Sequence, residues 1–342
     1  MNAVLKKAGV LVLAIGIVAG SLSSCSKSKE VEDEVSVYSI MPEKYATHIF
    51  AEFTNDTGIK VNFVRLSSGE ALSRLIAEKN NPQVDALWGG PSDTYDAGID
   101  EGIFEPYKPS EADKIPANYR SPDNYWTGIG IIPLCFLTNT NFLEKNNLPV
   151  PTSWDDYLHP AYANGLQMAD ARTSGTATER IYSLVKALGS EDAAFDYQKK
   201  LNKNVQLYTK SGAGGALPAA NGQAAGGIFY LVDALDIVNQ GYPLVISYPQ
   251  EGVTYGVEGS GIVKGCKHPA AAKKLMDWAS TKKLGDFMVA NKIFYIPTRP
   301  DVVVSDPALD MTKMSLIDAS SIWKGEKRQE YVERWIAEVI QQ

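Results

Sequence analysis

Short β-rich runs alternate with helical stretches from residue 35 onward, and this alternation constrains the fold more than any other feature of the chain. Gly58 follows the first helical stretch as a C-terminal cap, while Ser67 and Glu70 mark the start of the second one. The predicted order is strand 35–40, helix 43–57, strand 59–64, helix 67–80 and strand 84–88. Strands and helices in this order, joined by short loops, predict an α/β fold with a doubly wound sheet.

A second series of strands and helices begins near residue 131. It predicts a helix start at 151–158, strand 166–169, helix 172–187, strand 205–208, a turn at 209–215 with a short helix after it, and strand 226–231. Residues 259–263 predict a strand that returns to the first series, followed by helices 269–280 and 327–340. Without residues 1–25 the chain has 342 − 25 = 317 residues, more than one hydrophobic core comfortably holds. Two lobes are therefore expected.

The N-terminal residues have the pattern of a secretory signal. Lys6 and Lys7 precede an apolar run over 8–22, which is shorter than the roughly 18–20 residues of a membrane-spanning helix. Removing residues 1–25 lowers the basic count from 33 to 31 and leaves 40 acidic side chains, a formal net charge of −9. An acidic chain of this kind is poorly suited to the phosphate backbone, so nucleic acid is not an expected partner.

The segment Leu22-Ser23-Ser24-Cys25 resembles the lipobox of bacterial lipoproteins. The resemblance implies that Cys25 becomes the lipidated first residue of a lipoprotein anchored to a membrane, in the periplasm or at the cell surface. Residues 26–34 then form a flexible, charged tether. The alternative is an ordinary cleaved signal peptide in which this cysteine is incidental.

Several segments between residues 35 and 280 carry a family resemblance. They are Val37-Tyr38-Ser39, FTNDTGIKV at 53–61, LIAEKNNPQVDALW at 75–88, PTSWDD at 151–156, Gly226-Gly227-Ile228 with Asp233-Ala234-Leu235, and PAAAKK at 269–274. Together they are similar to the extracellular solute-binding proteins of bacterial ABC importers, in the branch of ferric-iron, phosphonate and hexose-phosphate binders. The resemblance implies a two-lobed periplasmic-binding-protein type II fold, with crossover strands near 129–136 and 258–263 and a ligand cleft between the lobes.

This resemblance also gives expectations for domains and partners. Residues 35–130 and 260–305 would form the first lobe, and residues 131–259 and 306–342 the second. The expected partners are ABC permease and ATPase subunits and a small anionic ligand, and the protein is expected to be a monomer. No resident cofactor is expected.

Four turns between strands and helices are rich in Gly, Ser and Thr. Their candidate ligand-binding residues are Ser67, Ser68 and Gly69; Gly90 and Ser92; Thr173, Ser174, Gly175 and Thr176; and Ser211, Gly212 and Ala213. Each turn would present backbone N–H groups and hydroxyls at a positive helix N-terminus, which suits an oxyanion. In open α/β sheets such turns lie at the carboxyl ends of strands, where ligands bind. For any single turn, simple helix capping is the alternative.

Several side chains could add selectivity. Arg65 and Arg172 lie beside the turns and could pair with phosphate or carboxylate, unless they are solvated surface residues. By resemblance to the family, Tyr38 would face the ligand and Asp233 would accept sugar hydroxyls, although Asp233 could instead cap a helix. Tyr255, with Trp88 and Trp126, would line the cleft or belong to the core.

Ferric iron is the competing ligand. Iron binders of the family commonly use adjacent tyrosines with a histidine or an acid, whereas this chain has Phe229-Tyr230 and no tyrosine pair there. Iron could still bind as a transported ligand through Tyr230, Asp233 and Tyr255 with a bridging anion. The three histidines, His48, His159 and His268, fall in or beside predicted helices and are expected to be structural.

No sequence motif of a known catalytic class is present, because the chain lacks Gly-x-Ser-x-Gly, His-Glu-x-x-His, Cys-x-x-Cys and a complete Walker loop. Cys135 and Cys266 are expected to be buried thiols, and a disulfide between them is an open alternative. The sequence therefore predicts a solute-binding lipoprotein that captures a phosphorylated sugar or a phosphonate. A ferric-ion carrier is the first alternative and an extracytoplasmic hydrolase the second.

Overall fold

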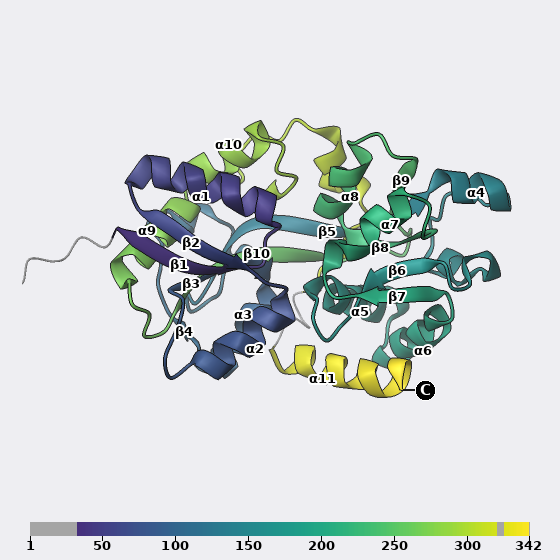
Figure 1. Cartoon of the computed structure of the whole chain (residues 1–342), viewed down its shortest axis with the longest axis horizontal. Coiled ribbons are helices and arrows are strands. Elements are labelled where there is room, and N and C mark those ends of the chain that lie inside the picture. Colours follow the sequence, from purple (N-terminus) through teal and green to yellow (C-terminus); the bar gives the residue numbers. More distant parts are fainter. Residues whose placement is uncertain (1–32, 320–324, 342) are drawn as a thin grey trace, which may run out of the picture. The chain divides into compact units, whose positions relative to one another are not determined.

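A mixed β-sheet runs through the computed structural model, which describes residues 33–319 and 325–341. Its strands are β1 (Glu34–Ser39), β2 (Lys60–Arg65), β3 (Ala86–Pro91), β4 (Phe104–Glu105), β5 (Thr127–Asn139), β6 (Leu166–Ala169), β7 (Val205–Thr209), β8 (Gly226–Tyr230), β9 (Leu244–Ser247), β10 (Tyr255–Val263) and β11 (Ile296–Pro297). Their order is β2-β1-β3-β10-β5-β8-β6-β7, with β4 beside β10 and with β9 and β11 beside β5 (Figure 1). The two ends of this order lie in two lobes.

In the first lobe, β1 pairs in parallel with β2 and β3, whereas β10 runs antiparallel to β3. The helices of this lobe are α1 (Glu43–Thr57), α2 (Ser68–Glu78), α3 (Ser92–Asp100), α9 (Pro269–Ala279) and α10 (Lys282–Ala290). α1 and α10 lie on one side of the sheet, and α2 and α3 on the other (Figure 1). The sheet is thus covered on both faces, as a doubly wound sheet requires.

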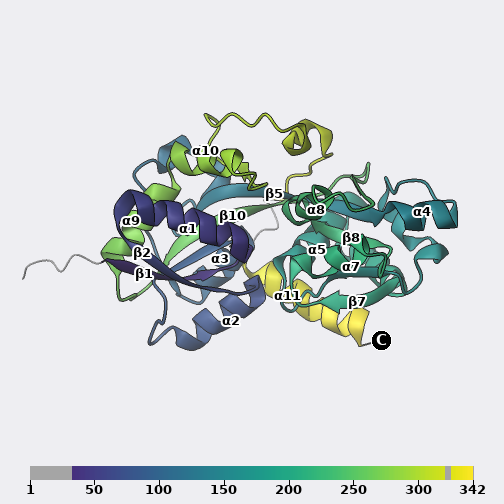
Figure 2. The same ribbon diagram turned by 45° about the horizontal axis from the view of Figure 1, so that its top comes forward.

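In the second lobe, β6 pairs in parallel with β7 and β8, while β8 and β9 run antiparallel to β5. Its helices are α4 (Thr140–Asn146), α5 (Gly175–Leu188), α6 (Glu191–Asn202), α7 (Ala216–Ala220) and α8 (Leu231–Val238). The C-terminal helix α11 (Gly325–Trp335) continues into a π-helical turn, Ile336–Ile340. α11 packs against α3 of the first lobe and α5 of the second (Figures 1 and 2).

The long strand β5 connects the lobes. Residues 127–133 of this strand pair with β10, and residues 134–138 pair with β8 of the second lobe. All its residues are buried, and Cys135 is a buried thiol within it. The predicted crossover strands near 129–136 and 258–263 are confirmed as parts of β5 and β10. The exact division of the chain between the lobes stays a prediction.

Local signals in the sequence correctly predict several helix ends. α1 ends at Gly58, whose φ of 75° is the left-handed conformation that glycine adopts readily. Ser67 and Glu70 form the reciprocal capping box of α2. The predicted helix start at 151–158 is instead a short 3₁₀ helix, Trp154–Leu158, because Pro160 disfavours helical backbone at the residue before it.

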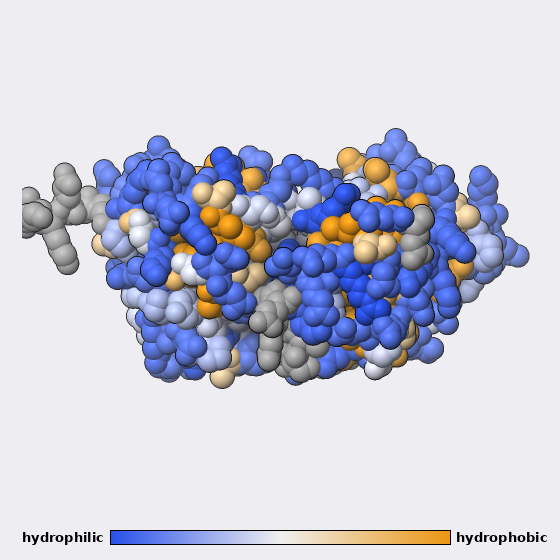
Figure 3. Space-filling view, turned by 90° about the horizontal axis from the view of Figure 1, so that it is seen from below, coloured by the Kyte–Doolittle hydropathy of each residue, from blue (hydrophilic) through white to orange (hydrophobic). Residues whose placement is uncertain are grey.

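None of the helices within the described residues is both long and apolar enough to cross a membrane. The face of the molecule on the α11 side is mostly hydrophilic, with hydrophobic side chains gathered in separate patches (Figure 3). The predicted signal peptide, the tether up to residue 32 and the lipidation site Cys25 lie outside the described residues.

Candidate functional site

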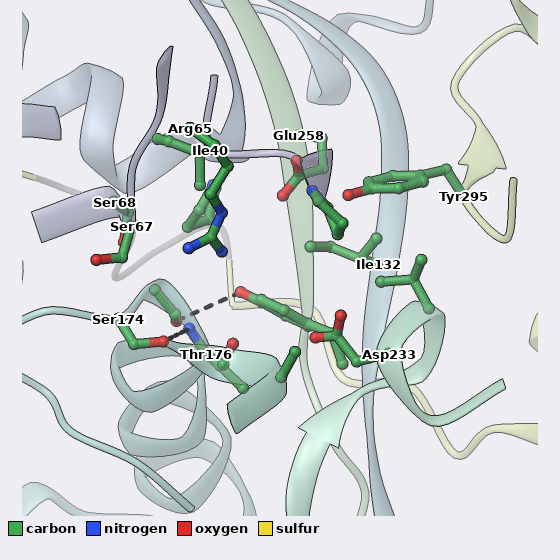
Figure 4. A pocket seen from close by; sticks show the side chains of 17 residues that line it. Ile40, Arg65, Ser67, Ser68, Ile132, Ser174, Thr176, Asp233, Glu258 and Tyr295 are labelled. Carbon is green, nitrogen blue, oxygen red and sulfur yellow. Dashed lines mark hydrogen bonds between the residues drawn. The ribbon is translucent and has the colours of Figure 1, made fainter. Parts of the chain in front are cut away.

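A pocket lies between the two lobes and encloses about 460 Å³ of empty space, including its opening to solvent (Figure 4). Residues from β2, α2 and β10 line one part of it, and residues from α5, β8 and α8 line the other. The full lining is Ile40, Pro42, Arg65, Ser67, Ser68, Pro91, Ile132, Ser174, Gly175, Thr176, Gly212, Ala213, Tyr230, Val232, Asp233, Glu258 and Tyr295. Both lobes therefore contribute polar groups to one site.

The first turn of α2 brings two serines to the pocket. The Ser67 hydroxyl donates to Glu70 Oε2 at 2.6 Å, so capping uses this hydroxyl. Ser68 is 1% exposed, and its hydroxyl has no hydrogen-bond partner among the described residues. A buried hydroxyl without a partner is costly, so Ser68 indicates a place where a ligand supplies the missing hydrogen bond.

The first turn of α5 faces that of α2 across the pocket. Ser174 caps α5, with its Oγ accepting from the Thr176 N–H at 3.3 Å. A Cβ atom added to Gly175 would lie 2.6 Å from Cγ of Pro91 and 3.0 Å from Oγ of Ser68, so glycine permits this close approach of the lobes. Two positive helix N-termini thus converge on one small volume, which suits an anionic group.

Two buried carboxyl groups occupy another part of the pocket (Figure 4). Asp233 lies in the first turn of α8, and Glu258 lies on β10. Burial, and then the Asp236 carboxylate, raises the pKa of Asp233 to about 7. Burial is also the main cause that raises the pKa of Glu258 to about 8, and the nearby Asp233 adds to it. The positive Arg65 guanidinium lowers the pKa of both groups and so favours their charged forms.

The remaining wall is apolar and aromatic, formed by Ile40, Ile132, Val232, Tyr230 and Tyr295. The Tyr230 hydroxyl donates to the Gly175 carbonyl at 3.3 Å, so this ring is fixed against the first turn of α5. The pocket therefore offers three kinds of contact: helix N-termini with hydroxyls, buried carboxyl groups and flat ring surfaces. A ligand with an anionic group, hydroxyls and a compact carbon frame matches all three.

The structure brings together many of the residues that the sequence singles out. Arg65 and eight of the predicted ligand-binding residues line the pocket, namely Ser67, Ser68, Ser174, Gly175, Thr176, Gly212, Ala213 and Asp233. Gly69, Gly90, Ser92, Thr173 and Ser211 lie in the same turns but do not line it. Gly69 and Thr173 instead join the lobes, since the Gly69 N–H donates to the Thr173 carbonyl at 3.0 Å.

Three predicted ligand residues lie outside this pocket. The Tyr38 hydroxyl donates to the Glu78 carboxylate at 2.9 Å, and Arg74 covers its ring. Arg172 pairs with the neighbouring Asp170, with Nη2 at 2.5 Å from Oδ2, so its guanidinium is already neutralised outside the pocket. The ring of Tyr255 packs edge-on against Tyr119 and does not line the pocket. Trp88 and Trp126, the two tryptophans proposed for the cleft, are buried core residues.

The ferric ligand set proposed from the sequence is not assembled. Tyr230 and Asp233 line the pocket, but Tyr255 does not. Within the described parts of the chain, no group of three or more His, Cys, Asp or Glu side chains is arranged to hold a metal ion. None of the three histidines lines the pocket. His268 Nδ1 lies 2.9 Å from Asp85 Oδ2, and His159 Nδ1 accepts from the Ala161 N–H.

Sequence reasoning missed Glu258 and Tyr295, as well as Ile40, Pro42, Pro91, Ile132 and Val232. A usable signal existed for Glu258, because it is a lone acid within a run that otherwise predicts a buried strand. A charged side chain in such a position is rarely buried without a specific role. Tyr295 follows α10 in a loop, and nothing in its local sequence marks it.

Comparisons with known proteins agree with this geometry. Residues 48–314 match the family model described as bacterial extracellular solute-binding protein. An uncharacterized protein of Haemophilus influenzae is 33% identical over 313 residues, covering 86% of this chain and 88% of its own length. The periplasmic binding protein AfuA of Actinobacillus pleuropneumoniae, solved with exogenous fructose-6-phosphate bound, superposes with a TM-score of 0.86 at 30% identity, covering 90% of this chain and 99% of AfuA.

The ferric ion-binding protein A of Pasteurella haemolytica shares the fold, with a TM-score of 0.74 at 19% identity and coverage of 90% of this chain and 98% of its own. The fold, the interlobe pocket and the family match over most of the chain all lead to the same assignment. The chain belongs to the family of bacterial extracellular solute-binding proteins.

Proposed function

We propose that the chain is the substrate-binding component of an ABC importer and captures a phosphorylated sugar between its lobes. The observation that carries this proposal is the buried Ser68 hydroxyl, which lines the pocket without a hydrogen-bond partner among the described residues. A phosphate placed there accepts the Ser68 hydrogen bond and meets the N-terminal turns of α2 and α5. Arg65 supplies a full positive charge to the same ligand.

The sugar is assigned to the part of the pocket away from the N-terminal turns of α2 and α5. Its hydroxyls would donate to the carboxyl groups of Asp233 and Glu258, and its carbon frame would lie against Tyr230 and Tyr295. The 30% identity with AfuA, which was solved with fructose-6-phosphate bound, supports a sugar phosphate as the ligand. A simple alkyl phosphonate is less suitable, because it has no hydroxyl or amino group to donate to these acids.

The protein acts outside the cytoplasm, as extracellular solute-binding proteins do. We assign it a carrier role without turnover: it binds the solute, closes, and passes it to a permease. For the membrane anchor we retain the sequence-based proposal that Cys25 is lipidated, although this residue lies outside the described part of the chain. Intact-mass spectrometry of the native protein and of a Cys25→Ser variant, both purified from a bacterial host, tests this, since only the native form should carry acyl mass.

Isothermal titration of the purified protein tests the solute. The probes are fructose-6-phosphate, fructose, inorganic phosphate, 2-aminoethylphosphonate and ferric citrate. We expect fructose-6-phosphate to bind at one site per chain, fructose to bind far more weakly, and no phosphate to be released from the bound ester. Tight binding of ferric citrate with a visible absorption band would replace the proposal by iron transport. Preference for 2-aminoethylphosphonate would replace the sugar by a zwitterion, and catalytic release of phosphate would indicate a hydrolase.

A further inference from the structure

Asp93, in the first turn of α3, joins the two lobes at a place outside the ligand pocket. Its carboxylate is buried, and Oδ2 accepts from the Tyr182 hydroxyl at 2.8 Å. The Thr178 hydroxyl lies 3.2 Å from the same oxygen and shares its hydrogen with the Gly175 carbonyl at 3.0 Å. Both donors lie on α5 of the second lobe. The bonds are therefore made only while α3 and α5 are close together.

A third element reaches the same carboxylate. Arg328 on α11 places its Nε 3.2 Å from Asp93 Oδ2, with side chains 7% and 2% exposed, respectively. α11 lies along α3 and α5, so it holds this arginine where the lobes meet (Figures 1 and 2). Asp93, Thr178, Tyr182 and Arg328 form what we name the Asp93 junction.

Two ion pairs between the lobes are much more exposed. Lys210 lies 2.5 Å from Glu70 at one rim of the pocket, with side chains 71% and 32% exposed. Lys44 pairs with Asp236 at another rim, where the lysine is also exposed. Such surface ion pairs contribute little because water and salt screen them, whereas hydrogen bonds to a buried carboxylate are among the strong ones. The Asp93 junction therefore favours closure more strongly than these ion pairs do, alongside the Gly69–Thr173 backbone bond and the Tyr45–Asp236 hydrogen bond.

We propose that the Asp93 junction is a latch that populates the closed arrangement of the lobes before ligand binds, and so sets ligand affinity without touching the ligand. Opening the lobes separates Asp93 from Thr178 and Tyr182, and closing restores both bonds. The apparent dissociation constant equals the intrinsic one divided by the closed fraction. Weakening the latch therefore raises the apparent dissociation constant in proportion to the loss of closed protein.

The test uses Tyr182→Phe with Thr178→Val, which removes both α5 hydroxyls while keeping the shapes of the side chains. Tyr331→Phe is the matched control, because the Tyr331 hydroxyl also donates to a carboxylate at 2.8 Å, but to Glu191, which lies on α6 of the second lobe. Fluorescent labels on Lys60→Cys of β2 and Leu207→Cys of β7, two exposed positions in different lobes, report closure by single-molecule energy transfer. Thermal melting checks that each variant is folded, and Tyr182→Phe alone replaces the pair if the pair unfolds.

We expect ligand-free native protein and Tyr331→Phe to share a closed population, and the double variant to lose most of it. The dissociation constant for fructose-6-phosphate should rise severalfold, by about the factor by which the closed fraction falls. Native protein with no closed population, or a double variant that matches Tyr331→Phe, would overturn the latch. The affinity measurement rests on the proposed function, but the distance measurement does not. If fructose-6-phosphate binds no form of the protein, the sugar proposal fails while the distances still decide on the latch.

Discussion

Glu258 Oε2 accepts a hydrogen bond from the backbone N–H of Gly90 at 2.6 Å, and this bond links β10 to the end of β3. Gly90 has a φ of 80°, and a Cβ atom there would lie 2.4 Å from Cδ1 of Ile40. A glycine is therefore required at this position both for its conformation and for space. Gly90, which the sequence suggested as a ligand contact, instead holds a carboxyl group that faces the pocket.

Replacing Glu258 by glutamine should stabilise the protein at alkaline pH. The pKa of Glu258 is raised from its ordinary 4.5 to about 8, so the folded protein keeps a proton that the unfolded chain releases near pH 4.5. Stability contributed by this group therefore falls as pH rises from about 4.5 to about 8 and is constant above that range. Glu258→Gln removes this loss of stability, and its side-chain amide keeps an oxygen that accepts the hydrogen bond from the Gly90 N–H. We expect a gain of a few kcal/mol at pH 8, given about 1.4 kcal/mol per pKa unit, and almost none at pH 4.

Thermal melting from pH 4 to pH 9 measures this difference. Glu144→Gln, at an exposed position on α4, is the control and should shift the melting temperature little at any pH. If Glu258→Gln and Glu144→Gln give the same dependence on pH, then Glu258 ionises in the folded protein as an ordinary surface acid does.

Ser68→Ala should weaken binding of a phosphorylated ligand roughly tenfold or more, because a hydrogen bond to a charged group is worth about 1.5–3 kcal/mol. It should not reduce stability, since the lost hydroxyl has no partner among the described residues. Ser39→Ala is a matched control: Ser39 is also a buried serine without a hydroxyl partner within the described chain, but it does not line the pocket. Titration calorimetry with fructose-6-phosphate compares them, and equal affinities for the two variants would remove Ser68 from the site.

The two arginines that the sequence suggested for anion binding should behave differently. Arg65 lines the pocket, whereas Arg172 is held by Asp170 outside it. Arg65→Met should weaken fructose-6-phosphate binding by roughly a hundredfold, because it removes the full positive charge from the pocket. Arg172→Met should change the dissociation constant less than twofold. A larger loss of affinity in Arg172→Met than in Arg65→Met would mean that the ligand binds beside Arg172, outside the pocket.

The sequence predicted those site residues that also serve a local structural role. Ser67 and Ser174 are helix caps with a recognisable spacing to the residues they serve, so the turns could be located without a structure. Arg172 lies outside the pocket, and its pairing with Asp170, only two residues earlier, competes with any ligand.

Glu258 and Tyr295 depend on long-range packing instead. Glu258 reaches the pocket through the pairing of β10 with β3, and its partner Gly90 is 168 residues away in the sequence. Tyr38 is expected at the ligand by resemblance to the family, but it lies within β1, which ends at Ser39, and Ile40 lines the pocket instead. A shift of one or two residues at a strand end decides which side chain faces the site, and local patterns do not fix such ends.

Gly69→Ala should prevent full closure of the lobes. A Cβ atom at Gly69 would lie 2.6 Å from the Arg172 carbonyl oxygen and 3.0 Å from Cα of Thr173, both backbone atoms that cannot rotate away. Folding of α2 itself should not suffer, because alanine favours a helix over glycine by about 0.5–1 kcal/mol. We therefore expect at least a tenfold loss of affinity for fructose-6-phosphate with little change in melting temperature. Small-angle scattering of the saturated protein should show a larger radius of gyration than for the native complex. Native affinity together with a native radius would mean that the close approach of α2 to the Arg172–Thr173 backbone is not needed for binding.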